Sequence, residues 1–116
     1  METRYHIQEM EVTPQEVKHW LDSSAPLALV DVREPFEHAV ARIDGAELIP
    51  MQTVPDHLEE IRAKAAAARV IVLCHHGVRS LNVVHWLRRQ GVENCWSMSG
   101  GIDLWSLAID PAVPRY

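Results

Sequence analysis

The sequence predicts an α/β protein, with about five strands in a mostly parallel sheet and helices on both faces. Two observations favour this class. Largely apolar runs, such as residues 27–32 with the single acid Asp31, and residues 70–73, are typical of strands that are buried on both faces of a parallel sheet. These runs alternate with segments in which apolar residues recur at helical spacing, which indicates strands linked by crossover helices.

Length and composition predict a single globular domain. The 116 residues are expected to form one domain over 1–116, with a core at about 5–112. Apolar residues make up 47 % and charged residues 23 %, which is ordinary for a globular protein. The net charge of −5, with no basic stripe, argues against a nucleic-acid partner. No apolar run approaches the roughly 20 residues that span a bilayer, so we expect no membrane partner.

Cysteine content and the first residues predict a cytoplasmic location. Cys74 and Cys95 are too few for a disulfide framework, and the chain opens without an apolar signal core. A reducing compartment fits both observations, because thiols stay free there.

The first elements have clear local signals. Residues 7–12 are predicted to form a short strand. Thr13 is a helix N-cap, with Pro14 at the first helical position and Glu16 completing a capping box. The apolar face of that helix is expected to hold Val17, Trp20 and Leu21.

The second strand, residues 27–32, brings two charged side chains to its carboxyl end. Asp31 is either a turn or cap residue, which we prefer, or a residue that supports a neighbouring loop. Arg33 either faces an anionic substrate or pairs with Glu34 or Glu37.

Two helices and a short strand follow. Pro35 opens a helix over 34–40, in which Phe36 and Val40 share one face. Residues 46–49 predict a third strand, and Thr53 is expected to cap the next helix. The buried stripe of that helix is predicted to be Val54, Leu58, Ile61 and Ala65.

The last third of the chain repeats the strand–helix alternation. The run at 70–73 leads through a loop into a helix that ends at Gly91. Its predicted apolar face is Leu81, Val83, Val84 and Leu87, and His85 and Trp86 are expected to pack. A short strand at 95–98 precedes a final helix, whose apolar residues are Ile102, Trp105 and Leu107.

Cys74 follows the central strand directly, at the sheet edge where open α/β proteins bind ligands. Backbone N–H groups of the following turn, the positive end of the next helix and the charge of Arg79 would each favour a thiolate, which is the reactive form. Gly77 allows the backbone conformation that such a turn needs. The alternative interpretation is a small, buried, inert cysteine.

Four segments, in order and at the right spacing, resemble the rhodanese family of sulfurtransferases. Cys-His-His-Gly-Val-Arg-Ser at 74–80 is similar to the family's active-site loop, and Leu-Val-Asp-Val-Arg-Glu at 29–34 to its Leu-Asp-Val-Arg-Glu segment. Residues 41–46 occupy the place of its Gly-His-Ile-Pro-Gly-Ala, and 99–105 resemble its Gly-Gly-x-x-Ala-Trp close.

The resemblance implies a rhodanese-like fold and a sulfurtransferase that carries sulfur as a persulfide on one cysteine, without a cofactor. The donor would be a small anion such as thiosulfate. The acceptor would be cyanide, a thiol or a protein cysteine. The predicted site is Cys74 as the catalytic residue, the donor-binding loop His75, His76, Gly77, Val78 and Arg79, and the supporting residues Asp31, Arg33 and Ser80.

Other interpretations of the same residues stay open. His75 and His76 either surround the mouth of the site, adding positive charge near or below neutral pH, or point into solvent. No metal is expected, since adjacent residues seldom turn towards one ion. Cys95 is either a resolving thiol or, more simply, buried. A binding or regulatory module, or a persulfide carrier, is an alternative function.

A cysteine-based phosphatase or arsenate reductase is a weaker alternative. Those enzymes resemble one another in a cysteine followed by five residues and an arginine. Here only four residues separate Cys74 from Arg79. A shorter loop suits a single sulfur atom better than a tetrahedral oxyanion.

Overall fold

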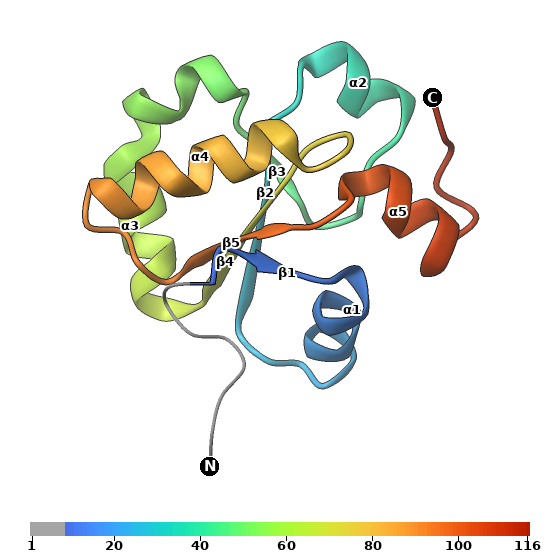
Figure 1. The fold of residues 1–116 in the computed structure, drawn as a ribbon, viewed down its shortest axis with the longest axis horizontal. Helices are drawn as coiled ribbons and strands as arrows, with labels where there is room; N and C mark the ends of the chain where they lie inside the picture. Colours follow the sequence, from blue (N-terminus) through green and yellow to red (C-terminus); the bar gives the residue numbers. More distant parts are fainter. Residues whose placement is uncertain (1–8) are drawn as a thin grey trace.

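A five-stranded, fully parallel sheet in the order β1-β5-β4-β2-β3 forms the centre of the computed structural model, which describes residues 9–116 (Figure 1). The strands are β1 (Glu11–Val12), β2 (Leu27–Asp31), β3 (Glu47–Leu48), β4 (Arg69–Leu73) and β5 (Cys95–Met98). The helices are α1 (Pro14–Asp22), α2 (Pro35–Val40), α3 (Leu58–Ala67), α4 (Val78–Arg89) and α5 (Gly101–Ala108), with a 3-10 helix η1 (Met51–His57). The predicted α/β class is therefore confirmed.

Helices cover both faces of this sheet, and the side chains of each strand alternate between two apolar clusters. On one face α1 and α5 pack against the strands, through side chains such as Trp20, Trp105 and Ile71. On the other face η1, α3 and α4 pack against Val70 and Val72. Cys74 continues this second series, because side chains of a strand change face at every residue. The cysteine therefore lies on the side of the sheet that α4 covers.

The register of the two central strands sets the position of the site. β2 and β4 pair along their whole length, with Asp31 opposite Leu73, and the Val32 N–H donates to the Leu73 carbonyl at 3.0 Å. Both strands therefore end at the same level. Arg33 and Cys74 therefore follow the carboxyl ends of two adjacent strands, which is where parallel sheets bind their ligands.

The predicted start of α1 is confirmed in detail. Thr13 Oγ1 accepts from the Glu16 N–H at 3.1 Å, and Glu16 Oε1 accepts from the Thr13 N–H at 2.7 Å. This reciprocal pair satisfies two N–H groups that a helix start otherwise leaves without partners. Of the first predicted strand, residues 7 and 8 lie outside the described residues, as does the start of the predicted core at 5. Of its described residues 9–12, only Glu11 and Val12 form β1.

The helix predicted to begin at Thr53 is wrong. Residues 51–57 form η1, and α3 begins only at Leu58. Pro55 lies inside η1, where it lacks an N–H and disfavours an α conformation for the residue before it. Thr53 Oγ1 donates to the Pro50 carbonyl at 2.8 Å instead of capping a helix. Val54 and Ile61 are nonetheless buried, as predicted.

Two packing predictions, one on α5 and one on α4, are also wrong. Leu107 is 58 % exposed, because α5 buries its 102, 105 and 106 positions and position 107 falls on the solvent side. His85 is exposed, whereas Trp86 packs against the core. The shared face of Phe36 and Val40 on α2 points to solvent, and α2 buries Glu37 instead.

Across residues 9–116 the longest helices are too short and too polar to cross a membrane.

Candidate active site

Cys74 lies between the end of β4 and the first turn of α4, with only 1 % of its surface exposed. Its Sγ accepts from the Gly77 N–H at 3.1 Å and from the Ser80 N–H at 3.3 Å, and it donates to Ser80 Oγ at 3.4 Å. The backbone donors come from a tight turn and from a helix N-terminus, the two arrangements that stabilise an anion most readily. The surroundings of Sγ are therefore suited to a negative charge.

Ser80 connects the sulfur to the neighbouring strand. Its hydroxyl donates to the Gly77 carbonyl at 3.2 Å and lies 2.7 Å from Ser97 Oγ on β5. Both serines are fully buried. The sequence prediction included Ser80 but missed Ser97, although a polar residue in an otherwise apolar buried strand is a usable signal.

The cysteine loop is held against the start of α5, which lies beside it in Figure 1. The N–H groups of Ile102 and Asp103 donate to the carbonyls of Cys74 and His75, at 2.9 and 3.1 Å. Gly101, with φ at +61°, allows this approach: a Cβ there would lie 2.5 Å from the Cys74 carbonyl oxygen and closer still to that of His75. α5 therefore fixes the backbone on either side of the sulfur.

Arg79 directs its guanidinium to Glu37 of α2. Nη1 and Nη2 donate to the two carboxylate oxygens at 2.8 and 2.9 Å. This pairing raises the pKa of Arg79 further and, together with the Glu34 N–H, lowers the pKa of Glu37 to about 2. The predicted positive charge of Arg79 is close enough to Cys74 to interact with it, but Glu37 balances much of that charge, which the sequence prediction missed.

Asp31 and Arg33 form a buried ion pair behind this site. The Arg33 Nη2 to Asp31 Oδ2 distance is 2.7 Å, and neither side chain is exposed. Arg33 also donates to the carbonyls of Glu37 and Ala41, at 3.2 and 2.6 Å. The alternative that Arg33 faces an anionic substrate is wrong, and so is its pairing with a glutamate side chain. Asp31 accepts from the Arg33 N–H at 3.1 Å, as a turn residue does.

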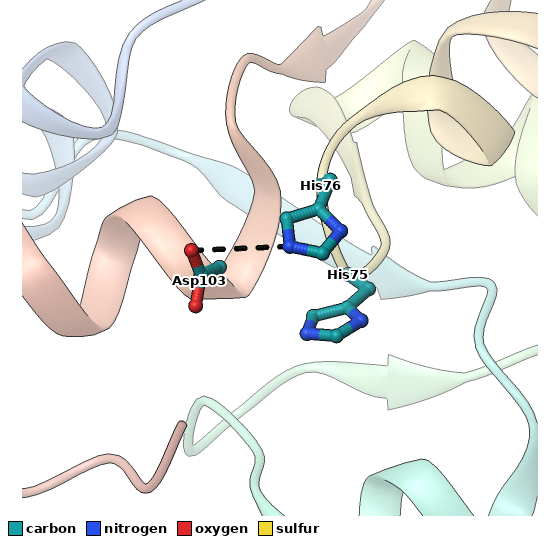
Figure 2. A group of neighbouring side chains, drawn as sticks. All are labelled: His75, His76 and Asp103. Atoms are coloured by element: carbon teal, nitrogen blue, oxygen red, sulfur yellow. Dashed lines mark ion pairs between the residues drawn. The ribbon is translucent and has the colours of Figure 1, made fainter. Parts of the chain in front are cut away.

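His75 and His76 lie on the outer side of the loop, near Asp103 (Figure 2). The two imidazole rings stack with centroids 3.9 Å apart, and His76 Nε2 lies 3.9 Å from Asp103 Oδ2. Burial, and then the neighbouring His76, lower the pKa of His75. This shift disfavours a positive charge on His75 near neutral pH, and its half-buried side chain does not simply point into solvent.

The same three side chains place their ligand atoms within 4.8 Å of one another, which is close enough to consider a metal. Both Asp103 oxygens, however, accept from Arg115, at 2.9 and 3.4 Å. The rings of His75 and His76 are only 27° from parallel, so their in-plane lone pairs do not converge on one point. We retain the expectation that no metal binds here.

Tyr116 joins the site from the far end of the chain and was missed by the sequence prediction. Its ring stacks on His75, with centroids 3.9 Å apart and planes 6° apart. Its hydroxyl accepts from Arg33 Nη1 at 2.8 Å and donates to Glu37 Oε1 at 2.9 Å. No local pattern in the sequence signals these contacts, because the partners lie 83 and 79 residues away.

Cys95 is buried in the core at the start of β5. Its thiol donates to the Val92 carbonyl at 3.3 Å, and burial raises its pKa to about 11. A thiol that stays protonated is a poor nucleophile, so the buried interpretation of Cys95 is favoured over a resolving role.

The ionised Glu37 is expected to stabilise the fold in a defined pH range. Because its folded pKa is about 2, below the ordinary 4.5, its contribution is fully present above about pH 4.5 and is lost as the pH falls towards 2. We expect the difference in unfolding free energy between the wild type and Glu37→Gln, measured in urea, to shrink over that range. A difference that stays constant from pH 6 to pH 2 would contradict this account, since the other carboxylates titrate equally in both proteins.

Residues 13–108 match the family model of the rhodanese-like domain, so the chain belongs to that family. It is 36 % identical to the thiosulfate sulfurtransferase GlpE of Haemophilus influenzae, over 91 % of this chain and 96 % of that protein. It is 38 % identical, over 90 % of its length, to the probable adenylyltransferase/sulfurtransferase MoeZ of Mycobacterium tuberculosis, of which it spans about a quarter (26 %).

Solved structures agree with the family assignment. A rhodanese-like domain protein from Staphylococcus aureus superposes with a TM-score of 0.76 at 32 % identity, covering 92 % of this chain and 98 % of that one. A thiosulfate sulfurtransferase from Pseudomonas aeruginosa gives 0.78 at 25 % identity, over 87 % of this chain and 19 % of that one. The predicted resemblance is thereby confirmed, and this chain is a homologue of sulfurtransferases.

Proposed function

We propose that this protein is a sulfurtransferase that carries a sulfane sulfur as a persulfide on Cys74, with thiosulfate as a competent donor. The observation that carries the proposal is the set of donors around Sγ: the N–H groups of Gly77 and Ser80, with the Ser80 hydroxyl beside them. Donors fixed in place before the reaction stabilise charge without reorganising. The relationship to the thiosulfate sulfurtransferase GlpE supports the choice of donor.

In the first half-reaction the Cys74 thiolate attacks the outer sulfur of thiosulfate. A bond forms between Sγ and that sulfur, while the bond between the two sulfur atoms of thiosulfate breaks. Sulfite leaves with the bonding electron pair, so the total charge is unchanged. The Ser80 hydroxyl, which can rotate, turns its proton towards the ionised sulfur, and the loop N–H groups hold the anion.

In the second half-reaction an acceptor attacks the outer sulfur of the persulfide. Cyanide then leaves as thiocyanate and the Cys74 thiolate is restored, with no net change of charge. A thiol or a protein cysteine accepts the sulfur in the same way. The reaction needs no cofactor, because Cys74 itself stores the transferred atom between the two steps.

The proposed donor-binding loop consists of His75, His76, Gly77, Val78 and Arg79. The proposed supporting residues, which hold this loop in place, are Asp31, Arg33 and Ser80. Because Glu37 balances Arg79, hydrogen bonding by the loop contributes more than net positive charge to holding the donor. We place the reaction in the cytoplasm, where the Cys74 thiol stays reduced. The loop keeps four residues between Cys74 and Arg79, which favours sulfur transfer over phosphate chemistry.

Steady-state kinetics with thiosulfate and cyanide test this function. We expect parallel double-reciprocal lines, the sign of a ping-pong mechanism, because sulfite leaves before cyanide binds. After thiosulfate alone, intact mass should increase by one sulfur atom, and subsequent cyanide should remove it. Lines that intersect, or sulfite release without a mass increase, would contradict a persulfide intermediate. No sulfite from thiosulfate would instead favour the binding-module interpretation.

A further inference from the structure

We propose that Tyr116 is a positioning residue for sulfur transfer, which fixes Arg79 and the cysteine loop by holding Glu37 and His75 at the same time. The inference rests on the proposed function of Cys74. It assigns a role to the C-terminal part of the chain, which lies beside α2 in Figure 1.

The hydroxyl of Tyr116 completes a chain of contacts from the sheet to the start of α4. Arg33, held by Asp31 at the end of β2, donates to the hydroxyl, and the hydroxyl donates to Glu37. Glu37 in turn accepts hydrogen bonds from both terminal nitrogens of Arg79. Arg79 directly precedes Ser80, whose N–H reaches Sγ at 3.3 Å. The orientation of Glu37 therefore bears on the backbone that holds the sulfur.

The ring of Tyr116 acts on the other side of the same loop. His75 directly follows Cys74, and its imidazole is stacked between Tyr116 and His76. The carbonyl of His75 is held by α5, so the residue is fixed through both its backbone and its side chain. Next to Tyr116, Arg115 pairs with Asp103 of α5, which anchors this part of the chain beside the site.

Two substitutions separate the hydroxyl from the ring. Tyr116→Phe keeps the stack on His75 but removes one donor from Glu37 and one acceptor from Arg33. We expect kcat/KM for thiosulfate to fall roughly tenfold, the size associated with losing one hydrogen bond to a charged group. Tyr116→Leu also removes the stack, and we expect a larger fall.

The coupling between Tyr116 and Glu37 distinguishes positioning from a general effect on folding. In a Glu37→Ala background the Tyr116 hydroxyl has no acceptor at position 37, so Tyr116→Phe should change kcat/KM by less than about twofold. A loss of the same size in both backgrounds would overturn the proposal. Wild-type kinetics in Tyr116→Phe would overturn it as well. Thermal unfolding of each variant identifies any protein that is not folded at the assay temperature.

Alkylation by iodoacetamide gives a readout that does not depend on sulfur transfer. In a Cys95→Ser background only Cys74 reacts, and its Sγ is nearly inaccessible in the wild-type loop. We expect Tyr116→Leu to be alkylated several-fold faster, while its transfer activity falls. If the wild type transfers no sulfur but the alkylation rate rises, the proposed function fails and the positioning role stands. An unchanged alkylation rate would overturn the positioning role.

Discussion

Replacing Cys74 by serine is expected to abolish thiocyanate formation and to prevent the gain of one sulfur atom in intact mass. Serine fits the same space and can accept from the N–H groups of Gly77 and Ser80, so the fold should be retained. Its hydroxyl does not ionise near neutral pH and cannot attack a sulfane sulfur. Loss of a covalent nucleophile costs several orders of magnitude in kcat, so we expect a fall of at least about a thousandfold.

Cys95→Ser is the matched control for that variant. Both cysteines are free and almost completely buried, and each follows or begins a central strand of the same sheet. With a pKa near 11 the Cys95 thiol stays protonated at neutral pH, so its loss should leave kcat within about twofold. Activity that survives in Cys74→Ser and disappears in Cys95→Ser would reverse the assignment of the sulfur carrier.

The second large effect is expected from Gly101→Ala. A methyl group there would overlap the carbonyl oxygens of Cys74 and His75, and the residue would have to keep a left-handed φ of +61°. Backbone strain of about 1–2 kcal/mol and overpacking of about 1–3 kcal/mol add to a loss of roughly 2–5 kcal/mol in unfolding free energy. Because the displaced carbonyls flank the sulfur, the variant should also lose most of its transfer activity.

Gly45→Ala separates these two contributions. Gly45 has a φ of +89°, yet nothing lies within 4 Å of the position that its Cβ would occupy. It should therefore show the left-handed strain alone, about 1–2 kcal/mol, with full activity. Urea unfolding and the thiosulfate assay on both variants measure the difference. If Gly101→Ala were no more destabilised than Gly45→Ala, close packing of α5 on the loop would not be needed.

Local signals in the sequence were sufficient for the architecture and for the position of the cysteine. The apolar runs that became β2 and β4 are continuous because both faces of these strands are buried. The capping box at Thr13 joins two residues that are three positions apart, so it could be predicted from one short segment of the sequence. Cys74, Gly77 and Ser80 likewise lie within seven consecutive positions, so the loop could be proposed before its geometry was known.

Predictions from the sequence failed where the type of one residue suggested a role that its neighbours or its packing override. Thr53 has the residue type of an N-cap, but Pro55 disfavours the α conformation for Val54, which would be the first residue of such a helix. Leu107 has the residue type of a core position, but the phase of α5 is set by its packing on the sheet and turns this side chain outward.

The electrostatics of the site depend on the tertiary structure, because its partners are far apart in the chain. Arg79 could be predicted near the sulfur, but its neutralisation by Glu37, 42 residues earlier, could not. The same holds for the contact of Ser80 with Ser97 and for the position of Tyr116 on His75 and Glu37. The sequence thus determined the fold and the position of the Cys74 sulfur through short-range patterns. The charge balance and rigidity around that atom were decided by which helices and chain segments meet at the carboxyl edge of the sheet.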